Sequence, residues 1–306
     1  MKIVVTGALG HIGSCLIRDF PQRVPHAEII MIDNLSTQRY ASLFNLEHSA
    51  NYRFIEGDVQ ELDLVPLLKG ATVIHLAAAT DAARSVENRR VIEGNFELTK
   101  KVAEACIESG ADMLFPSTTS VYGTQEDKVD EDCQPEDLKP QSPYAETKYR
   151  EEELLRELGV SHNLRYVICR FGTICGTSPG MRFHTAVNKF CWQAAMGQSV
   201  TVWRTAYEQK RPYLDLLDAA RSIEFIVHKE LFDRKVYNVL SVNSTVREIV
   251  EIIRRFIPDL QVKFTESEIM NQLSYEVSNQ RLRNLDFEFK GNLEIGIRDT
   301  IKLLKL

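Results

Sequence analysis

The chain has 306 residues, 44% of them hydrophobic, and a formal net charge of -6 at pH 7. This length suits one or two domains with a large core, and the acidic balance argues against a nucleic-acid partner. No apolar run is long enough to span a membrane, and the amino terminus, MKIVVTG, enters a strand without the apolar region of a signal peptide. We therefore expect a cytoplasmic protein with no membrane partner.

The cysteines and histidines give no sign of a disulfide framework or a metal site. The six cysteines contain no Cys-x-x-Cys pair, and several lie in apolar stretches, where cysteine behaves as a small hydrophobe. This usage fits a reducing compartment. The seven histidines show no metal-ligand spacing, so we expect no bound metal.

Short β-rich runs alternate with helical patterns up to about residue 170. The predicted strands cover residues 2–7, 28–33, 52–58, 72–78, 112–118 and 166–172. Most are continuously apolar, which is typical of a parallel sheet buried on both faces. Helical patterns cover residues 87–109 and the segment after Pro143. The alternation predicts βαβ crossovers and a doubly wound α/β sheet.

The pattern changes after about residue 175. A loop from Gly176 to Gly180 precedes helical patterns at 183–196, 218–230 and 245–256, with brief strands between them. We therefore expect a first lobe over residues 1–175 and a smaller, mixed lobe over residues 176–306, with segments that interleave.

A glycine loop, VVTGALGHIGS, follows the first predicted strand and places Gly7, Gly10 and Gly13 before a helix. Glycines there let the backbone approach a pyrophosphate at the positive end of the helix. Asp33 ends the second strand roughly 20 residues later, where a carboxylate binds an adenosine ribose and repels a 2′-phosphate. The pattern predicts a Rossmann site that prefers NAD to NADP, although Arg39 could favour NADP. A glycine turn without a ligand is the structural alternative.

The stretch SPYAETK, residues 142–148, places a tyrosine and a lysine where a helix begins. Ser142 is a good N-cap and Pro143 suits the first helical position. The helix formers that follow predict a helix that ends at Gly159. Tyr144 and Lys148 then lie one turn apart on one face. A plain surface contact between ring and lysine would have the same spacing, so the two interpretations need other motifs to separate them.

Several motifs, in this order, resemble those of the extended short-chain dehydrogenase/reductase family, in particular its NAD-dependent sugar-nucleotide epimerases and dehydratases. The matching stretches are TGALGHIG (6–13), GDV (57–59), HLAA (75–78), GNFELT (94–99), STTSVYG (117–123), YAETK (144–148) and KRPYLDLLDAA (210–220). IDNLS (32–36) is particularly similar to the UDP-galactose 4-epimerase subgroup. The resemblance covers essentially the whole chain.

The resemblance implies roles for individual residues. Tyr144 would be the catalytic acid/base, Lys148 would bind the nicotinamide ribose, and the hydroxyl of Thr118 would donate to the reacting oxygen. The implied cofactor contacts are Gly7, Gly10, His11, Ile12, Gly13, Asp33, Asn34, Asp58, Val59, Leu76, Ala77, Ala78, Asn95, Tyr144 and Lys148. Thr118 could instead be a strand end satisfied by the backbone, and we expect His75 to be a satisfied wall residue.

An ammonium beside a phenol favours the phenolate, so we expect Lys148 to lower the pKa of Tyr144. A lowered pKa would make proton exchange with a sugar hydroxyl feasible near neutral pH.

Departures from the family pattern fall in the substrate half. Thr119 and Ser120 stand where many sugar-nucleotide 4,6-dehydratases carry an Asp-Glu pair, which argues against dehydration. Thr173 stands where epimerases often have asparagine, and residues 271–274 lack the second arginine. We expect substrate contacts from Thr118, Thr173, Arg182, Asn188 and Arg211. Of these, Arg182 and Asn188 are substitutes that could instead lie on the surface.

These residues predict an NAD-dependent enzyme that takes a hydride from carbon 4 of a nucleoside-diphosphate sugar and acts as a homodimer. A 4-epimerase is the favoured outcome. A 4-dehydrogenase or ketoreductase needs the same groups, so the motifs do not separate it from an epimerase. A non-catalytic NAD-sensing regulator would be expected to lose the tyrosine, the lysine or the hydroxyl, and all three are present.

Overall fold

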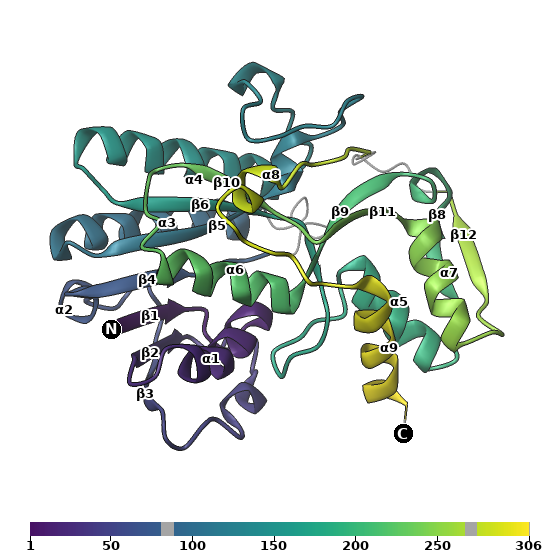
Figure 1. Cartoon of the computed structure of the whole chain (residues 1–306), viewed down its shortest axis with the longest axis horizontal. Helices are drawn as coiled ribbons and strands as arrows, with labels where there is room; N and C mark the ends of the chain where they lie inside the picture. Colours follow the sequence, from purple (N-terminus) through teal and green to yellow (C-terminus); the bar gives the residue numbers. More distant parts are fainter. Residues whose placement is uncertain (81–88, 267–273, 306) are drawn as a thin grey trace.

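The computed structural model describes residues 1–80, 89–266 and 274–305, which form an α/β architecture built on a parallel sheet (Figure 1). The seven strands have the order β10-β6-β5-β4-β1-β2-β3, and every adjacent pair is parallel. Their bounds are β1 (Lys2–Thr6), β2 (Glu28–Asp33), β3 (Asn51–Glu56), β4 (Ala71–His75), β5 (Asp112–Thr118), β6 (Tyr166–Phe171) and β10 (Val236–Val239). The predicted doubly wound fold is confirmed.

Helices cover both faces of this sheet. Helices α1 (His11–Arg23) and α6 (Leu216–His228) pack on one face. Helices α2 (Val65–Leu68), α3 (Arg89–Ser109) and α4 (Pro143–Ser161) pack on the other. Because apolar side chains point to both faces of each central strand, the continuous apolar runs of the sequence are buried in two cores.

Helix α4 continues past the predicted end at Gly159 and stops at Ser161. A Cβ on Gly159 would lie 2.7 Å from the ring of Tyr166. The glycine is therefore required by close packing of the helix on β6, and it does not end the helix. The predicted helix at residues 87–109 corresponds to α3, and residues 87 and 88 lie outside the described residues.

The second lobe has its own core, between small sheets and helices. One sheet has the order β11-β9-β7 and the other pairs β12 with β8. The elements are β7 (Thr173–Cys175), α5 (Ala186–Ala195), β8 (Val200–Trp203), β9 (Lys210–Asp215), β11 (Val242–Thr245), α7 (Val246–Phe256), β12 (Val262–Thr265) and α9 (Leu293–Leu304). Helix α8 (Gln280–Arg283) instead contacts β10, and its Leu282 is part of the core of the large sheet. Short 3-10 turns lie at η1 (Tyr40–Leu43), η2 (Thr119–Tyr122), η3 (Pro135–Asp137) and η4 (Arg204–Ala206). Among the helices of the described ranges, none has the length and apolarity needed to cross a membrane.

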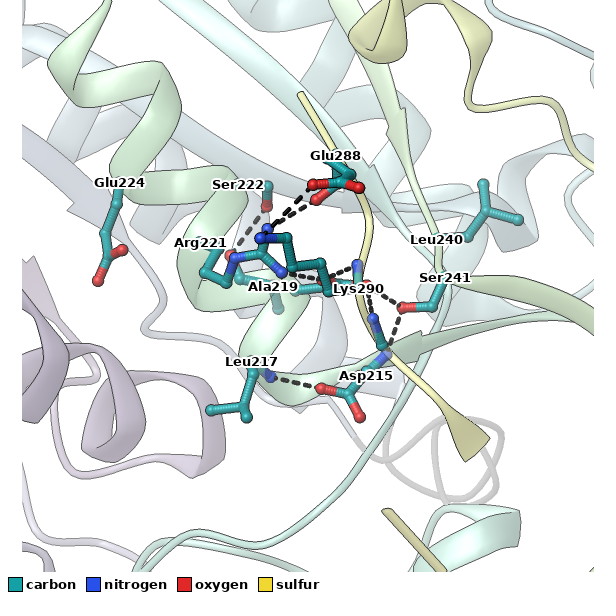
Figure 2. A network of polar contacts seen from close by, with 12 residues as sticks. Asp215, Leu217, Ala219, Arg221, Ser222, Glu224, Leu240, Ser241, Glu288 and Lys290 are labelled. Atoms are coloured by element: carbon teal, nitrogen blue, oxygen red, sulfur yellow. Dashed lines mark hydrogen bonds and ion pairs between the residues drawn. The ribbon is translucent and has the colours of Figure 1, made fainter. Parts of the chain in front are cut away.

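A buried carboxylate, Asp218, ties the two parts of the chain together. It lies in the first turn of α6 and accepts hydrogen bonds from the amides of Lys290 and Gly291, at 2.9 and 2.7 Å. The hydroxyl of Ser241 and the guanidinium of Arg221 also donate to it. Figure 2 shows Arg221, Ser241 and Lys290 converging around the start of α6. Asp218 thus holds three segments at one point: the turn from β9 into α6, the segment after β10 and the segment before α9.

This cluster predicts that Gly291→Ala destabilises the protein. A Cβ at this position would lie 2.6 Å from both Asp218 Oδ2 and Ser241 Oγ. Such overpacking costs ~1–3 kcal/mol, which urea unfolding would measure. The control is Gly94→Ala within α3, where a Cβ meets nothing within 4 Å. We expect this control to be neutral or stabilising; equal destabilisation of both variants would contradict the packing argument.

Candidate active site

A cleft of ≈ 570 Å³ opens where strands β1, β2 and β4 end. In an open parallel sheet, this carboxyl edge is where ligands bind. Its lining includes all of the predicted cofactor contacts except Tyr144 and Lys148: Gly7, Gly10, His11, Ile12, Gly13, Asp33, Asn34, Asp58, Val59, Leu76, Ala77, Ala78 and Asn95. The structure therefore brings into one cleft residues that are far apart in the sequence.

The glycine loop forms the floor of this cleft. Gly7 has φ +66°, and a Cβ there would lie 2.7 Å from the amide nitrogen of Ala77. A Cβ on Gly13 would lie 2.6 Å from the carbonyl oxygens of Gly7 and Ala8. Only glycine fits at both positions, and the loop delivers the chain directly into the amino terminus of α1. The backbone thus leaves room for a pyrophosphate at the positive end of this helix.

Cationic side chains surround the same floor. Arg39 and Arg182 both line the cleft. Burial and the charges of Arg182 and Arg39 lower the pKa of His11 to about 3, so this histidine is neutral at physiological pH. An anionic ligand such as a dinucleotide fits this arrangement of positive charge. Arg182, which we predicted as a substrate contact, lies on the cofactor side and donates to Thr80.

Acidic side chains form the opposite rim, after β2 and β3. Asp33 accepts hydrogen bonds from the amides of Leu9 and Leu35, both at 3.0 Å. Asp58 accepts one from the side chain of Asn34 at 3.0 Å. These bonds hold the carboxylate of Asp33 at the edge of the cleft, where a ribose would meet it.

The position of Asp33 predicts that NAD binds more tightly than NADP, by about tenfold or more, which corresponds to ~1.4 kcal/mol. The carboxylate would repel a 2′-phosphate, whereas Arg39 would attract it. In Asp33→Asn the difference should narrow, and exposed Asp63→Asn serves as a charge control. Fluorescence titration with both cofactors measures this preference. Tighter binding of NADP to the unaltered protein would identify Arg39 as the selector.

Asn95 lines the cleft, and His75 ends the adjacent strand β4 next to the lining residue Leu76. The amide of Asn95 forms two hydrogen bonds with the backbone of Ala79, at 2.8 and 2.9 Å. The ring of His75 is buried, and burial together with the charge of Lys148 lowers its pKa to about 3. His75 is hydrogen-bonded on both nitrogens, by Thr6 and Thr99. It is satisfied, as expected, but it is buried behind the lining of the cleft and is not part of its wall.

The predicted tyrosine and lysine lie at the start of α4. The hydroxyl of Ser142 accepts a hydrogen bond from the amide of Ala145, so the predicted N-cap is confirmed. Lys148 is buried, with its ammonium 4.3 Å from the centre of the Phe115 ring. The same ammonium lies 3.1 Å from a carboxylate oxygen of Glu151. The sequence analysis did not anticipate this buried partner.

The expected lowering of the Tyr144 pKa is wrong for this structure. Burial and the charge of Glu151 raise the pKa of Tyr144, and Arg182 opposes this only in part. The physical reason is first burial, which disfavours the charged phenolate, and second the negative charge of Glu151, which also lies beside the Lys148 ammonium. Tyr144 is therefore a neutral phenol in the protein as described.

Thr118 ends β5 and caps the turn η2. Its hydroxyl oxygen accepts a hydrogen bond from the amide of Ser120 at 3.1 Å, which leaves its proton available to a ligand. The neighbouring hydroxyls are engaged elsewhere: Ser117 donates to Glu152, and Thr119 donates to the carbonyl of Phe171. This difference supports Thr118 over its neighbours as the substrate-facing hydroxyl.

Tyr275 was missed by the sequence analysis. Its hydroxyl lies 3.3 Å from that of Thr119, although its side chain comes from the carboxyl-terminal segment. No local pattern marks it, because it reaches the end of β5 only through the return of the chain from the second lobe.

Of the other predicted substrate residues, two are partly exposed and one is buried. Thr173 in β7 and Arg211 in β9 lie on neighbouring strands of one sheet, and both are partly exposed. Asn188 is fully buried, its amide oxygen accepts from Gly176 and its nitrogen donates to the carbonyl of Arg182. The structure therefore does not support a contact between Asn188 and a substrate. Residues 271–273, where we noted a missing arginine, lie outside the described residues.

Metal ligands are not gathered anywhere in residues 1–80, 89–266 and 274–305, where no group of three or more His, Cys, Asp or Glu could hold an ion. All six cysteines are free thiols.

Comparison with known proteins places this site in a family. Over 314 residues, the chain is 28% identical to the trifunctional UDP-glucose 4,6-dehydratase/UDP-4-keto-6-deoxy-D-glucose 3,5-epimerase/UDP-4-keto-L-rhamnose-reductase RHM1 of Arabidopsis thaliana. This alignment covers 98% of the chain but 46% of the relative, so the chain spans about half of that protein. It is 30% identical over 264 residues to the uncharacterized UDP-glucose epimerase YtcB of Bacillus subtilis (83% and 81% covered).

A solved structure shares the whole fold. The UDP-N-acetylglucosamine 4-epimerase from Methanobrevibacter ruminantium M1, in complex with UDP-N-acetylmuramic acid, superposes with a TM-score of 0.85 at 26% identity, over 98% of this chain and 97% of that one. The homologues are NAD-dependent UDP-sugar 4-epimerases and 4,6-dehydratases, and the cofactor is NAD. The model of the NAD dependent epimerase/dehydratase family matches residues 3–239. The chain therefore belongs to this family, which is of the extended short-chain dehydrogenase/reductase type.

Proposed function

We propose that the protein is a sugar-nucleotide 4-epimerase, which oxidises carbon 4 of a nucleoside-diphosphate sugar and reduces the same carbon from the opposite face. The observation that carries this proposal is the contact of helix α4, which bears Tyr144 and Lys148, with β5 and η2, which meet at Thr118. Tyr144 and Lys148 lie one turn apart on α4, and Thr118 lies at the end of β5, at the same edge of the sheet as the cofactor cleft.

In this proposal each side chain has one task. Tyr144, once ionised to the phenolate, takes the proton of the 4-hydroxyl and later returns it, and Thr118 donates a hydrogen bond to the same oxygen. Lys148 holds a positive charge near the phenol. NAD, when bound, supplies the site with a hydride acceptor. Inversion then requires that the 4-keto sugar turns within the site while its nucleotide stays bound.

A 4,6-dehydratase is less well supported, although relatives of that kind match the chain. Elimination of water needs an acid and a base near carbons 5 and 6. Thr119 and Ser120 occupy the positions of the usual pair, and the hydroxyl of Thr119 is engaged by Phe171 and Tyr275. A 4-dehydrogenase or ketoreductase would use the same residues and end after one hydride transfer.

The fate of the hydride tests the proposal. Candidate nucleotide sugars labelled with deuterium at carbon 4 would be incubated with the enzyme, and products would be followed by NMR and by NADH absorbance. An epimerase retains the label at carbon 4 of an inverted product without net NADH. Steady NADH formation would identify a dehydrogenase, and a 4-keto-6-deoxy product would identify a dehydratase.

Arg211 is the proposed partner of the substrate diphosphate. Its planar guanidinium can form two directed, charge-assisted bonds with phosphate oxygens. Arg211→Ala should weaken nucleotide-sugar binding by about 10- to 100-fold, since bonds to charged groups contribute ~1.5–3 kcal/mol. NAD binding should not change. Lys210→Ala is the matched control, because Lys210 is exposed and pairs with Glu276. Calorimetric titration that finds equal losses for both ligands would contradict this role.

A further inference from the structure

A chain of buried polar groups runs from the cofactor cleft to the Lys148 ammonium. It begins at the amide of Ala77, which lines the cleft and donates to Thr6 Oγ1 at 3.2 Å. Thr6 Oγ1 lies 2.8 Å from His75 Nδ1, and His75 Nε2 lies 3.3 Å from Thr99 Oγ1. The hydroxyl of Thr99 donates to Glu151 Oε1 at 2.5 Å. The chain thus joins β1, β4, α3 and α4.

The donors fix the direction of every bond in this chain. Thr99 gives its one proton to Glu151, so it accepts from His75 Nε2–H, and the other nitrogen of a neutral ring, Nδ1, then accepts from the hydroxyl of Thr6. A neutral His75 that accepts on Nδ1 carries its proton on Nε2 and donates to Thr99, which donates to Glu151. All protons therefore point toward Glu151, as the ionised carboxylate requires. The lowered pKa of His75 agrees with a neutral ring.

Glu151 and Lys148 form a buried ion pair on the helix that bears the reacting phenol of Tyr144. The side chain of Glu151 is 0% exposed and that of Lys148 is 5% exposed, with 3.1 Å between the carboxylate oxygen and Nζ. At such burial the pair is weakly screened by solvent. The carboxylate therefore offsets the ammonium, and its charge raises the pKa of Tyr144, where an unpaired ammonium would strongly favour the phenolate.

Other charges around α4 do not replace this effect. Arg182, from the segment before α5, is the cation that lowers the pKa of Tyr144, against burial and Glu151, which raise it. Glu152, the next acid on α4, is paired with Arg170 of β6 at 2.7 Å. His75 of β4 is neutral, and α3 and β5 contribute Thr99 and Phe115 at this point.

We propose that Glu151 is a positioning residue: it holds the Lys148 ammonium in place, offsets its charge, and so sets the pH at which Tyr144 gives up its proton. The proposal deepens the proposed function, since it concerns the same acid/base. In this proposal, the hydrogen bonds that run from His75 through Thr99 keep Glu151 ionised. The step is a proton equilibrium: the phenol O–H breaks, the proton goes to solvent, and the phenolate remains.

The test is Glu151→Gln, which keeps the size and an acceptor oxygen for Thr99 but removes the charge. Ionisation of Tyr144 would be followed in the NAD-loaded protein without any sugar, by phenolate absorbance, with Tyr144→Phe subtracted. We expect the midpoint to move to lower pH by roughly 1–3 units, as for a group beside an unpaired opposite charge. Where a substrate is turned over, the acidic limb of the kcat profile should move equally. An unchanged midpoint, or one at higher pH, would overturn the proposal.

Two further variants separate charge from shape. Glu146→Gln removes an exposed acid from the first turn of the same helix and should leave the midpoint unchanged. The double variant Lys148→Met/Glu151→Met removes the pair as a unit, which proteins often tolerate, and its midpoint should move less than the roughly 1–3 units expected for Glu151→Gln. If Glu151→Gln does not fold, the double variant still tests the proposal. A large shift of the Tyr144 midpoint in the double variant would refute the claim that Glu151 and Lys148 offset each other's charge. The absorbance readout needs no sugar, so it stands even if no nucleotide sugar is epimerised.

Discussion

Tyr144→Phe should lower kcat by ~10²–10⁴-fold, the usual contribution of a general acid/base. The substitution removes the only titrating proton of the side chain and keeps its ring, which is packed at the start of α4. Affinity for NAD should remain, because the cleft that holds the predicted cofactor contacts is formed by other residues. The loss should therefore appear in kcat, with little change in substrate affinity.

Single-turnover kinetics with a labelled nucleotide sugar would measure this loss. The control is Tyr149→Phe, the same chemical change one turn along α4, at a tyrosine that packs against a separate apolar cluster. Near-normal turnover by the Tyr144 variant, or an equal loss in the control, would refute the assignment.

Glu152→Ala should remove ~3–5 kcal/mol from the free energy of unfolding, the usual cost of breaking a buried ion pair. Glu152 is fully buried and accepts two bonds from the guanidinium of Arg170, at 2.9 and 2.7 Å. It also accepts from Ser117, next to the predicted catalytic hydroxyl. The substitution leaves the Arg170 charge buried without its partner, in a protein whose total stability is expected to be about 5–15 kcal/mol.

Urea unfolding followed by circular dichroism tests this expectation. The matched control is Glu153→Ala, the next residue on α4, whose side chain is 52% exposed and pairs with Arg156. Exposed pairs contribute only ~0–1 kcal/mol. A loss below ~1 kcal/mol for Glu152→Ala would show that the guanidinium finds another partner.

Local patterns in the sequence were enough to predict most of the first sheet and the cofactor cleft. A buried parallel strand is continuously apolar, and a loop such as the one from Gly7 to Gly13 is confined to glycine by contacts within a few residues and one neighbouring strand. The helix start at Ser142 depends on its own next turn. Such features can be read from short stretches because their causes are short-range.

The remaining features depend on contacts between distant segments. Tyr275 contacts Thr119 although the sequence of most of the second lobe separates them, and Arg182, which follows the first lobe, lines the cofactor cleft. The most instructive error concerns Lys148: its spacing from Tyr144 was correct, but the charge that the phenol experiences depends on a buried acid. Sequence spacing locates a side chain, and packing determines its electrostatics.

The position of β10 has a consequence for the order in which the chain can fold during synthesis. The sheet is complete only when Val236–Val239 pairs with β6, whose residues lie about seventy positions earlier (Figure 1). Until then one side of β6 is an unpaired edge, which is a template for association with other chains. Because domains fold as they emerge from the ribosome, the nascent protein carries this open edge while β7, α5, β8 and β9 are translated. Ribosome stalling before residue 236 should therefore expose an aggregation-prone intermediate, and release of the whole chain should not.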